Sequence, residues 1–227
     1  MGTRSLLLLL ADGRFPAGAH AHSGGLEAAV AAGRVTDLAT LAAFLRGRLA
    51  TAGLVGAAFA AAAHRAVPAG DRAAVLAVLD AELDARTAAP ALRTVSRRQG
   101  RALLRAGHRV WPGGPFAGLP DPGEGPHQPL VLGLVGAAAG LDPADTALVA
   151  AYGTVTGAAS AGLRLLGLDP YHVHALLADL AGACDVTAAT AVAAADGQPE
   201  ALPAAAAPLS DIHAEAHATW EVRLFAS

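Results

Sequence analysis

The sequence contains no lysine, a single cysteine and few aromatic residues. Its 227 residues include one cysteine, Cys184, and only 4% are Phe, Trp or Tyr. One cysteine excludes an intrachain disulfide and a CxxC metal or redox site, so a reducing, cytoplasmic location is predicted. All 16 basic residues are arginine. Together with the abundant alanine, glycine and proline, this indicates a genomic composition bias rather than a mechanism.

The sequence also lacks the patterns of common enzyme and nucleic-acid-binding sites. A net charge of −3 and a pI near 6.3 argue against nucleic-acid binding by the chain as a whole. There is no Walker A loop, dinucleotide-binding glycine fingerprint, HExxH motif or GxSxG elbow. Carboxylates are scarce, and no pair lies on an apolar helix face as an acid–base couple. We therefore predict a protein that is not an enzyme, with no catalytic residues and no cofactor.

Helical patterns account for nearly the whole chain. Alternating strand patterns are missing, and a core of alanine and leucine suits closely packed helices. We predict one all-α domain over residues 1–227, a bundle of about eight to ten helices. A Pro/Gly-rich loop over residues 112–129 and a Pro/Ala linker over residues 195–210 interrupt it. The predicted helices are Ser5–Asp12, Gly24–Ala32, one capped by Thr36-Asp37, one opened by Asp71, Leu92–Arg109, Leu130–Gly140, Pro143 to about Leu166, Pro170 towards Ala194, and Asp211 to the chain end.

A mean hydropathy of +0.43 makes a membrane span worth testing. Thr146–Leu163 carries no charge and has Gly153 and Gly157 four residues apart. It is barely long enough to span a bilayer, and its alanine and glycine bury little apolar area. The run Leu6–Leu10 is too short for a signal peptide. Both segments are interpreted as packed helices of a soluble protein.

Arginine recurs every four residues in one segment. Arg93, Arg97, Arg101, Arg105 and Arg109 would form one basic stripe along a helix. The stripe is interpreted either as a solvated helix face or as a docking surface for an acidic partner. Nucleic acid is disfavoured, because the segment has no aromatic side chain to stack on bases.

Histidine is the one residue type with catalytic or metal-binding potential that is well represented, and the chain has nine histidines. Two HxH pairs occur, at His20 and His22 and at His172 and His174. His213 and His217 lie four apart in a predicted helix, which is a metal-ligand spacing. No third ligand lies nearby in the sequence, so no metal site is predicted. The alternative to metal binding for each histidine pair is solvent exposure or ordinary packing.

Three segments resemble one known family. Leu8–Asp12 is followed by Phe15–Glu27 and then by Gly33; Ser96–Leu104 lies in mid-chain; and the chain ends in Arg223–Ser227. In content, order and spacing they resemble the urease accessory protein UreF family. Two departures from the pattern are the histidines His20 and His22 at positions where the family has aromatics, and His217-Ala218 where a His-Glu pair is common.

The resemblance implies an all-helical, homodimeric scaffold without catalytic chemistry. Such a protein binds a UreD/UreH-type accessory protein, recruits the GTPase UreG and takes part in nickel delivery to apo-urease. We expect no nucleic-acid or membrane partner. The rival hypothesis is a nickel carrier that binds the metal through His20, His22, His213 or His217.

The resemblance and the residue patterns together suggest where partners bind. Phe15 and Pro16 would form an apolar knob, and Leu224 and Phe225 an apolar tip. The alternatives are a turn that only joins two helices and a tail that packs within the chain. The expected partner-binding residues are Phe15, Pro16, Gly18, Ser23, Gly25, Leu26, Glu27, Arg97, Arg101, Arg223, Leu224 and Phe225.

Overall fold

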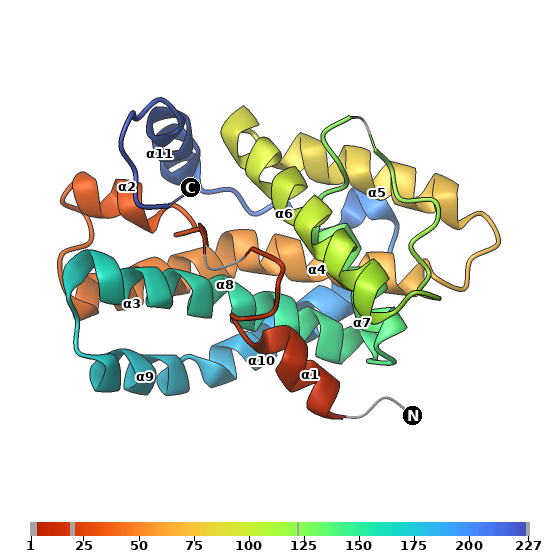
Figure 1. Cartoon of the computed structure of the whole chain (residues 1–227), viewed down its shortest axis with the longest axis horizontal. Helices are drawn as coiled ribbons and strands as arrows, with labels where there is room; N and C mark the ends of the chain where they lie inside the picture. The colour runs from red at the N-terminus through yellow and green to blue at the C-terminus, as the bar shows by residue number, and fades with distance from the viewer. Residues whose placement is uncertain (1–3, 19–20, 122, 226–227) are drawn as a thin grey trace.

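The computed structural model describes residues 4–18, 21–121 and 123–225. Every regular element in these ranges is a helix (Figure 1), so the all-α prediction is confirmed. The elements are α1 (Arg4–Ala11), α2 (Leu26–Ala31), α3 (Leu38–Arg48), the π-helical turn η2 (Leu49–Gly53), α4 (Leu54–Arg65), α5 (Arg72–Arg86), α6 (Pro90–Val110), α7 (Gln128–Ala138), α8 (Pro143–Leu166), α9 (Pro170–Asp179), α10 (Ala181–Ala194), the 3-10 turn η3 (Pro199–Ala201) and α11 (Pro208–Ala218).

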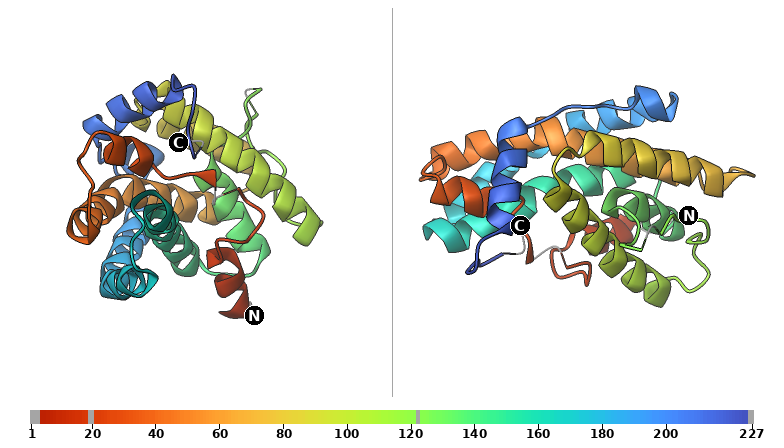
Figure 2. Two further views of the ribbon diagram at one scale, coloured as in Figure 1. Left: turned by 60° about the vertical axis from the view of Figure 1, so that its left-hand side comes forward. Right: turned by 90° about the horizontal axis from the view of Figure 1, so that it is seen from above.

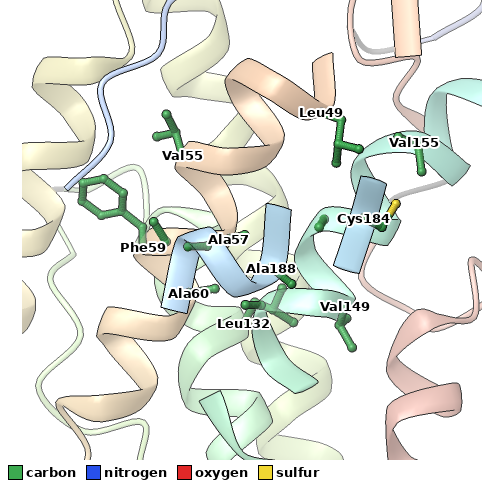
Figure 3. Packing of buried hydrophobic residues seen from close by; sticks show 14 of the residues in the cluster. Leu49, Val55, Ala57, Phe59, Ala60, Leu132, Val149, Val155, Cys184 and Ala188 are labelled. Carbon is green, nitrogen blue, oxygen red and sulfur yellow. The ribbon is translucent and has the colours of Figure 1, made fainter. Parts of the chain in front are cut away.

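Helix α4 lies at the centre and packs against α7, α8 and α10. Its alanines between residues 57 and 61 are fully buried, as is Phe59, and Figure 3 shows α4 residues packed beside Leu132, Val149 and Ala188. Small side chains let the helices approach closely: a Cβ added at Gly133 of α7 would clash with the carbonyl oxygen of Ala60. The alanine-rich composition thus allows these helices to pack closely.

Predicted helix starts agree with the structure where an aspartate precedes them. Asp37 accepts a hydrogen bond from the backbone N–H of Thr40, and the Thr40 side chain reciprocates in a capping box. The Asp142 side chain accepts the backbone N–H of Asp145 at the start of α8, and that of Asp169 accepts the backbone N–H of Tyr171 at the start of α9. Each is followed by proline at the first helical position.

Two helices differ from the sequence prediction. The segment expected to run from Pro170 towards Ala194 is two helices, α9 and α10, which meet at a bend of 42°. The last helix begins at Pro208 rather than Asp211, because proline suits a first helical turn, and it ends at Ala218 instead of continuing to the terminus. The residues that follow bond elsewhere in the chain.

Apolar helices are covered by other helices. In the described ranges one continuous helical run, Leu38–Arg65, is long and apolar enough to cross a membrane, or two spans if the bent pair α9–α10 counts as one. Leu38–Arg65 contains α4, whose neighbours enclose it. The Thr146–Leu163 segment lies within α8, where Ala147, Ala151 and Ala158 are buried. Core packing accounts for the apolar character of α4 and α8, while 28% of the most apolar window of the whole run Leu38–Arg65 is buried.

The first and last helices of the described chain pack against different parts of the bundle. α11 lies over α2 and α6, while α1 packs against α8 (Figures 1 and 2). The tail after α11 returns towards α2, so the C-terminal residues meet the segment that follows the first turn.

Candidate partner-binding site

The turn after α1 is folded against the protein's own core. Phe15 donates its backbone N–H to the Asp12 carbonyl oxygen at 2.9 Å, and its ring is only 7% exposed. The expectation that Phe15 forms a protruding knob is therefore wrong; Pro16 beside it is exposed. Gly18 completes the turn with a φ of 77°, and His20 lies outside the described residues.

The residues after the turn fix the start of α2. Gly25 immediately precedes the helix with a φ of 86°, a conformation that glycine adopts without strain. Leu26 is fully buried, and the buried Ser23 hydroxyl accepts the Glu27 backbone N–H at 3.2 Å. Together these contacts hold the Glu27 side chain in place at the first turn of α2.

Glu27 joins this N-terminal segment to the C-terminal tail. Its Oε1 accepts the backbone N–H of Leu224 at 2.7 Å, and its Oε2 accepts that of Phe225 at 3.0 Å. Oε2 also lies 2.9 Å from His217 Nε2 on α11. We call these four residues, Glu27, His217, Leu224 and Phe225, the clasp. It connects positions nearly 200 residues apart and explains why the tail leaves the helical path.

The clasp favours an ionised Glu27. Burial alone raises the pKa of a carboxyl group, but the hydrogen bonds from Leu224, His217 and Phe225 outweigh it and hold the pKa of Glu27 below its ordinary value. A carboxylate with several charge-assisted hydrogen bonds ties its partners more strongly than a neutral acceptor. The tail position thus depends on the charge of Glu27.

The tail presents one buried and one exposed side. Phe225 is 3% exposed and lies under the Arg164 guanidinium, 4.4 Å from the ring centroid. Leu224 and Val222 are 62% and 88% exposed, and Arg223 is also exposed. Phe225 therefore packs within the chain, whereas Leu224 and Arg223 face outward beside the clasp.

The arginine stripe does not form one surface. Arg105 and Arg109 are exposed, but Arg97 is 6% exposed and Arg101 is half-buried, bonded to the carbonyl of Glu124. Arg93 donates to the Thr87 carbonyl at 2.7 Å. The helix prediction is confirmed as α6, but the expectation of a continuous docking stripe is wrong, because α5 and the following loop cover its middle.

Arg97 belongs to a closed polar network. Its Nη2 lies 2.9 Å from Asp80 Oδ2 and 2.9 Å from Asp84 Oδ1, and its Nη1 donates to the Gly125 carbonyl at 2.9 Å. His127, which is fully buried, contacts Asp84 through Nε2 at 3.0 Å. The network joins α5, α6 and the loop before α7, so Arg97 contributes to the stability of the fold.

The same network shifts the pKa values of its members. Against the effect of burial, Asp80 and Asp84 raise the pKa of Arg97, while Arg97 and His127 lower that of Asp84. Burial and then Arg97 lower the pKa of His127. The group is therefore held as an arginine cation, carboxylates and a neutral imidazole.

The described histidines do not gather into a metal centre. His217 is part of the clasp, and His213, four residues earlier, lies in a shallow cavity between α3 and α11. His174 bonds to the Pro170 carbonyl, and His172 lies near Asp169. Across residues 4–18, 21–121 and 123–225, no group of three or more His, Cys, Asp or Glu side chains is arranged to hold a metal ion.

Sequence reasoning selected Glu27 and the tail but missed their contact. It noted His217 for its spacing from His213 and for the His217-Ala218 departure from the family pattern, but not as a partner of Glu27, and it did not select Arg164, which covers Phe225. Nothing in the local sequence of α8 marks Arg164, because its role depends on the tail folding back across the bundle.

Comparison with known proteins agrees with this geometry. The UreF family model matches residues 35–181, more than half of the chain. A urease accessory protein UreF from Mycobacterium sp. (strain JLS) is 49% identical over 227 residues, with both chains covered completely. Its counterpart from Mycolicibacterium vanbaalenii is 46% identical over 228 residues, also with full coverage. That from Mycobacterium tuberculosis (strain H37Rv) is 49% identical over 193 residues, 85% of this chain and 87% of the relative. The chain belongs to the UreF family of urease accessory proteins.

Proposed function

We propose that this chain is a homodimeric scaffold that binds a UreD/UreH-type accessory protein, recruits the GTPase UreG and helps to assemble the nickel centre of urease in the cytoplasm. It does so without catalysing a reaction, and without a nucleic-acid or membrane partner. The relatives carry the name of accessory proteins, which gives the general role in urease maturation.

The clasp is the observation that carries the proposal. It fastens the segment that contains Ser23, Gly25, Leu26 and Glu27 to the C-terminal tail. Ser23, Leu26 and Glu27 are buried there, so the tail supplies the exposed side chains of the site. The exposed side chains of the tail are the apolar Val222 and Leu224 and the charged Glu221 and Arg223. Exposed apolar residues rimmed by charge are typical of a protein-binding patch.

A histidine-based nickel carrier is the second candidate. His217 is 3% exposed, with its Nε2 bonded to Glu27, so this candidate needs Nδ1 of His217 to become accessible before His213 and His217 bind a metal together. Nickel titration of the isolated chain separates the two. Tight stoichiometric binding that is lost in His213→Ala would favour the carrier.

Complex formation tests the scaffold directly. We would mix the chain with purified UreD/UreH-type and UreG-type proteins and measure mass by size-exclusion chromatography with light scattering. The scaffold predicts a stable complex with two copies of this chain. No complex with folded partners would overturn the proposal.

A pair of matched variants locates the contact. Leu224→Asp changes an exposed side chain next to the clasp, and Leu209→Asp makes the same change at an exposed position at the start of α11. We expect the tail variant to weaken binding of the UreD/UreH-type partner at least tenfold and the α11 variant to change it less. Equal binding by both would remove the tail from the interface.

A further inference from the structure

A cavity of about 270 Å³ lies between the first turn, α3, α6, α7 and α8. Most of its wall is apolar, with Leu10, Leu103, Leu132 and Val149 among the lining residues. One cationic side chain, that of Arg48 at the end of α3, reaches it. None of the four clasp residues lines this cavity.

Arg48 has no carboxylate partner among the described residues. Its Nη1 donates to the Gly24 carbonyl oxygen, and its buried Nε has no hydrogen-bond partner. Three other arginines have an unbonded buried Nε. Arg65 and Arg86 are paired with acidic side chains, however, and Arg72 does not line this cavity. Among these four arginines, Arg48 is the one that both lacks an acidic partner and lines this cavity.

Burial lowers the pKa of Arg48 to about 10, and no neighbouring carboxylate opposes the effect. The group is still a cation at neutral pH. Arg48 is half-buried, with its Nε out of contact with solvent, and a charge so placed normally has a partner because water solvates it poorly. The one carboxylate in the wall, Asp12, is held by Arg14 Nε at 3.0 Å and Nη2 at 2.8 Å. Asp12 is therefore engaged by Arg14 and forms no ion pair with Arg48.

The Arg48 guanidinium occupies the space that a side chain at Gly24 would need. Gly24 has a φ of 63°, and a Cβ there would lie 2.7 Å from the Arg48 Cζ atom. The absence of a side chain leaves the guanidinium room against the backbone of the N-terminal segment. His22 and the amides of Gln99 and Gln128 also line the cavity and supply further polar groups around the charge.

We propose that this cavity binds a carboxylate group on an aliphatic stem, inserted as a glutamate side chain of a partner protein. The apolar wall suits the methylene groups, and the guanidinium suits the carboxylate, which it can bind in bidentate fashion. Leu8 and Leu9 of α1, 69% and 41% exposed, lie on the helix that leads to the cavity and would be covered by the same partner. The choice of a protein as the source of the carboxylate rests on the proposed function.

The first arm of the test needs no partner. The full chain, labelled with ¹⁵N, is titrated with sodium butyrate while the arginine Nε–Hε signals are followed by NMR. The Arg48 signal is assigned by its absence in Arg48→Met. We expect a saturable shift of that signal with butyrate and none with 1-butanol, which has the stem without the charge. The absence of a saturable shift would overturn the proposal.

The second arm uses the UreD/UreH-type protein and UreG. Arg48→Met should weaken assembly at least tenfold, and Arg48→Lys, which keeps a cation, should restore part of it. Gly24→Ala keeps Arg48 but displaces its guanidinium, so it should weaken assembly as well. Arg46→Met is the control, since Arg46 is exposed on the same helix. Circular dichroism establishes that each variant is folded.

The two arms separate the possible outcomes. A butyrate shift with weakened assembly supports the proposal. A butyrate shift with unchanged assembly overturns the protein source and assigns the cavity to a free small carboxylate. If the wild-type chain forms no complex, the proposed function and the protein source both fail, while the butyrate arm still decides whether the cavity binds carboxylates.

Discussion

The buried Arg97 and the half-buried Arg48 have opposite surroundings. Arg97 meets Asp80, Asp84 and a backbone carbonyl, so its charge is fully matched. Arg48 meets one carbonyl and a largely apolar cavity. The first arrangement stabilises the fold, because its charges compensate one another. The second costs stability in the isolated chain, and such a cost is typical of a site kept for a ligand.

Arg97→Met should have the largest effect. It leaves the buried Asp80 and the partly exposed Asp84 without their cation, so we expect a loss of about 3–5 kcal/mol in the free energy of unfolding. Urea denaturation measures it. Arg105→Met, an exposed position on the same helix, should stay within about 0.5 kcal/mol of wild type. Similar values for the two variants would show that the network contributes little.

Arg48→Met should change stability in the other direction. Replacing an uncompensated cation by an apolar side chain of similar length removes the desolvation cost, and we expect a gain of about 1–3 kcal/mol. The same urea titration applies, with Arg46→Met as the exposed control. A loss of stability would mean that Arg48 is a structural residue like Arg97.

Glu27→Gln should act locally. The clasp loses its charge but keeps an acceptor, so we expect a loss of about 1–2 kcal/mol. Because the pKa of Glu27 is lowered in the folded state, its contribution is present above about pH 4.3 and is lost as pH falls further. The backbone amide signals of Leu224 and Phe225, followed by NMR from pH 7 to 3, should move together in wild type. Independent movement would argue against a shared carboxylate.

The smallest expected effect is a pH dependence near Arg97. The pKa of His127 is lowered in the folded state, so the unfolded chain takes up a proton first as pH falls. The free energy of unfolding should therefore decrease below about pH 6.5. In His127→Gln the decrease between pH 7 and 5 should be shallower. An identical slope in both proteins would exclude His127 as its source.

The helices were predictable because their signals are local. Asp37, Asp142 and Asp169 mark helix starts through contacts within four residues, and the sequence shows each one. The end of α11 at Ala218 was not predictable, since the amides after it bond to Glu27, far away in the sequence.

The roles of charged residues were harder to predict. The four-residue spacing of the arginines identified α6 correctly, but it could not reveal that Asp80 and Asp84 of α5 enclose Arg97. No sequence pattern marked Arg48 as a site residue, because its cavity forms only where the first turn and four helices meet. Partners and oligomeric state remain proposals that rest on the family and on the geometry of the clasp.

One preparation of Arg48→Met tests the central comparison most directly. Its free energy of unfolding and its affinity for the UreD/UreH-type partner are measured side by side with wild type. The account predicts a protein that is more stable and binds at least tenfold more weakly. A less stable protein with unchanged affinity would contradict it and would place Arg48 in the same structural class as Arg97.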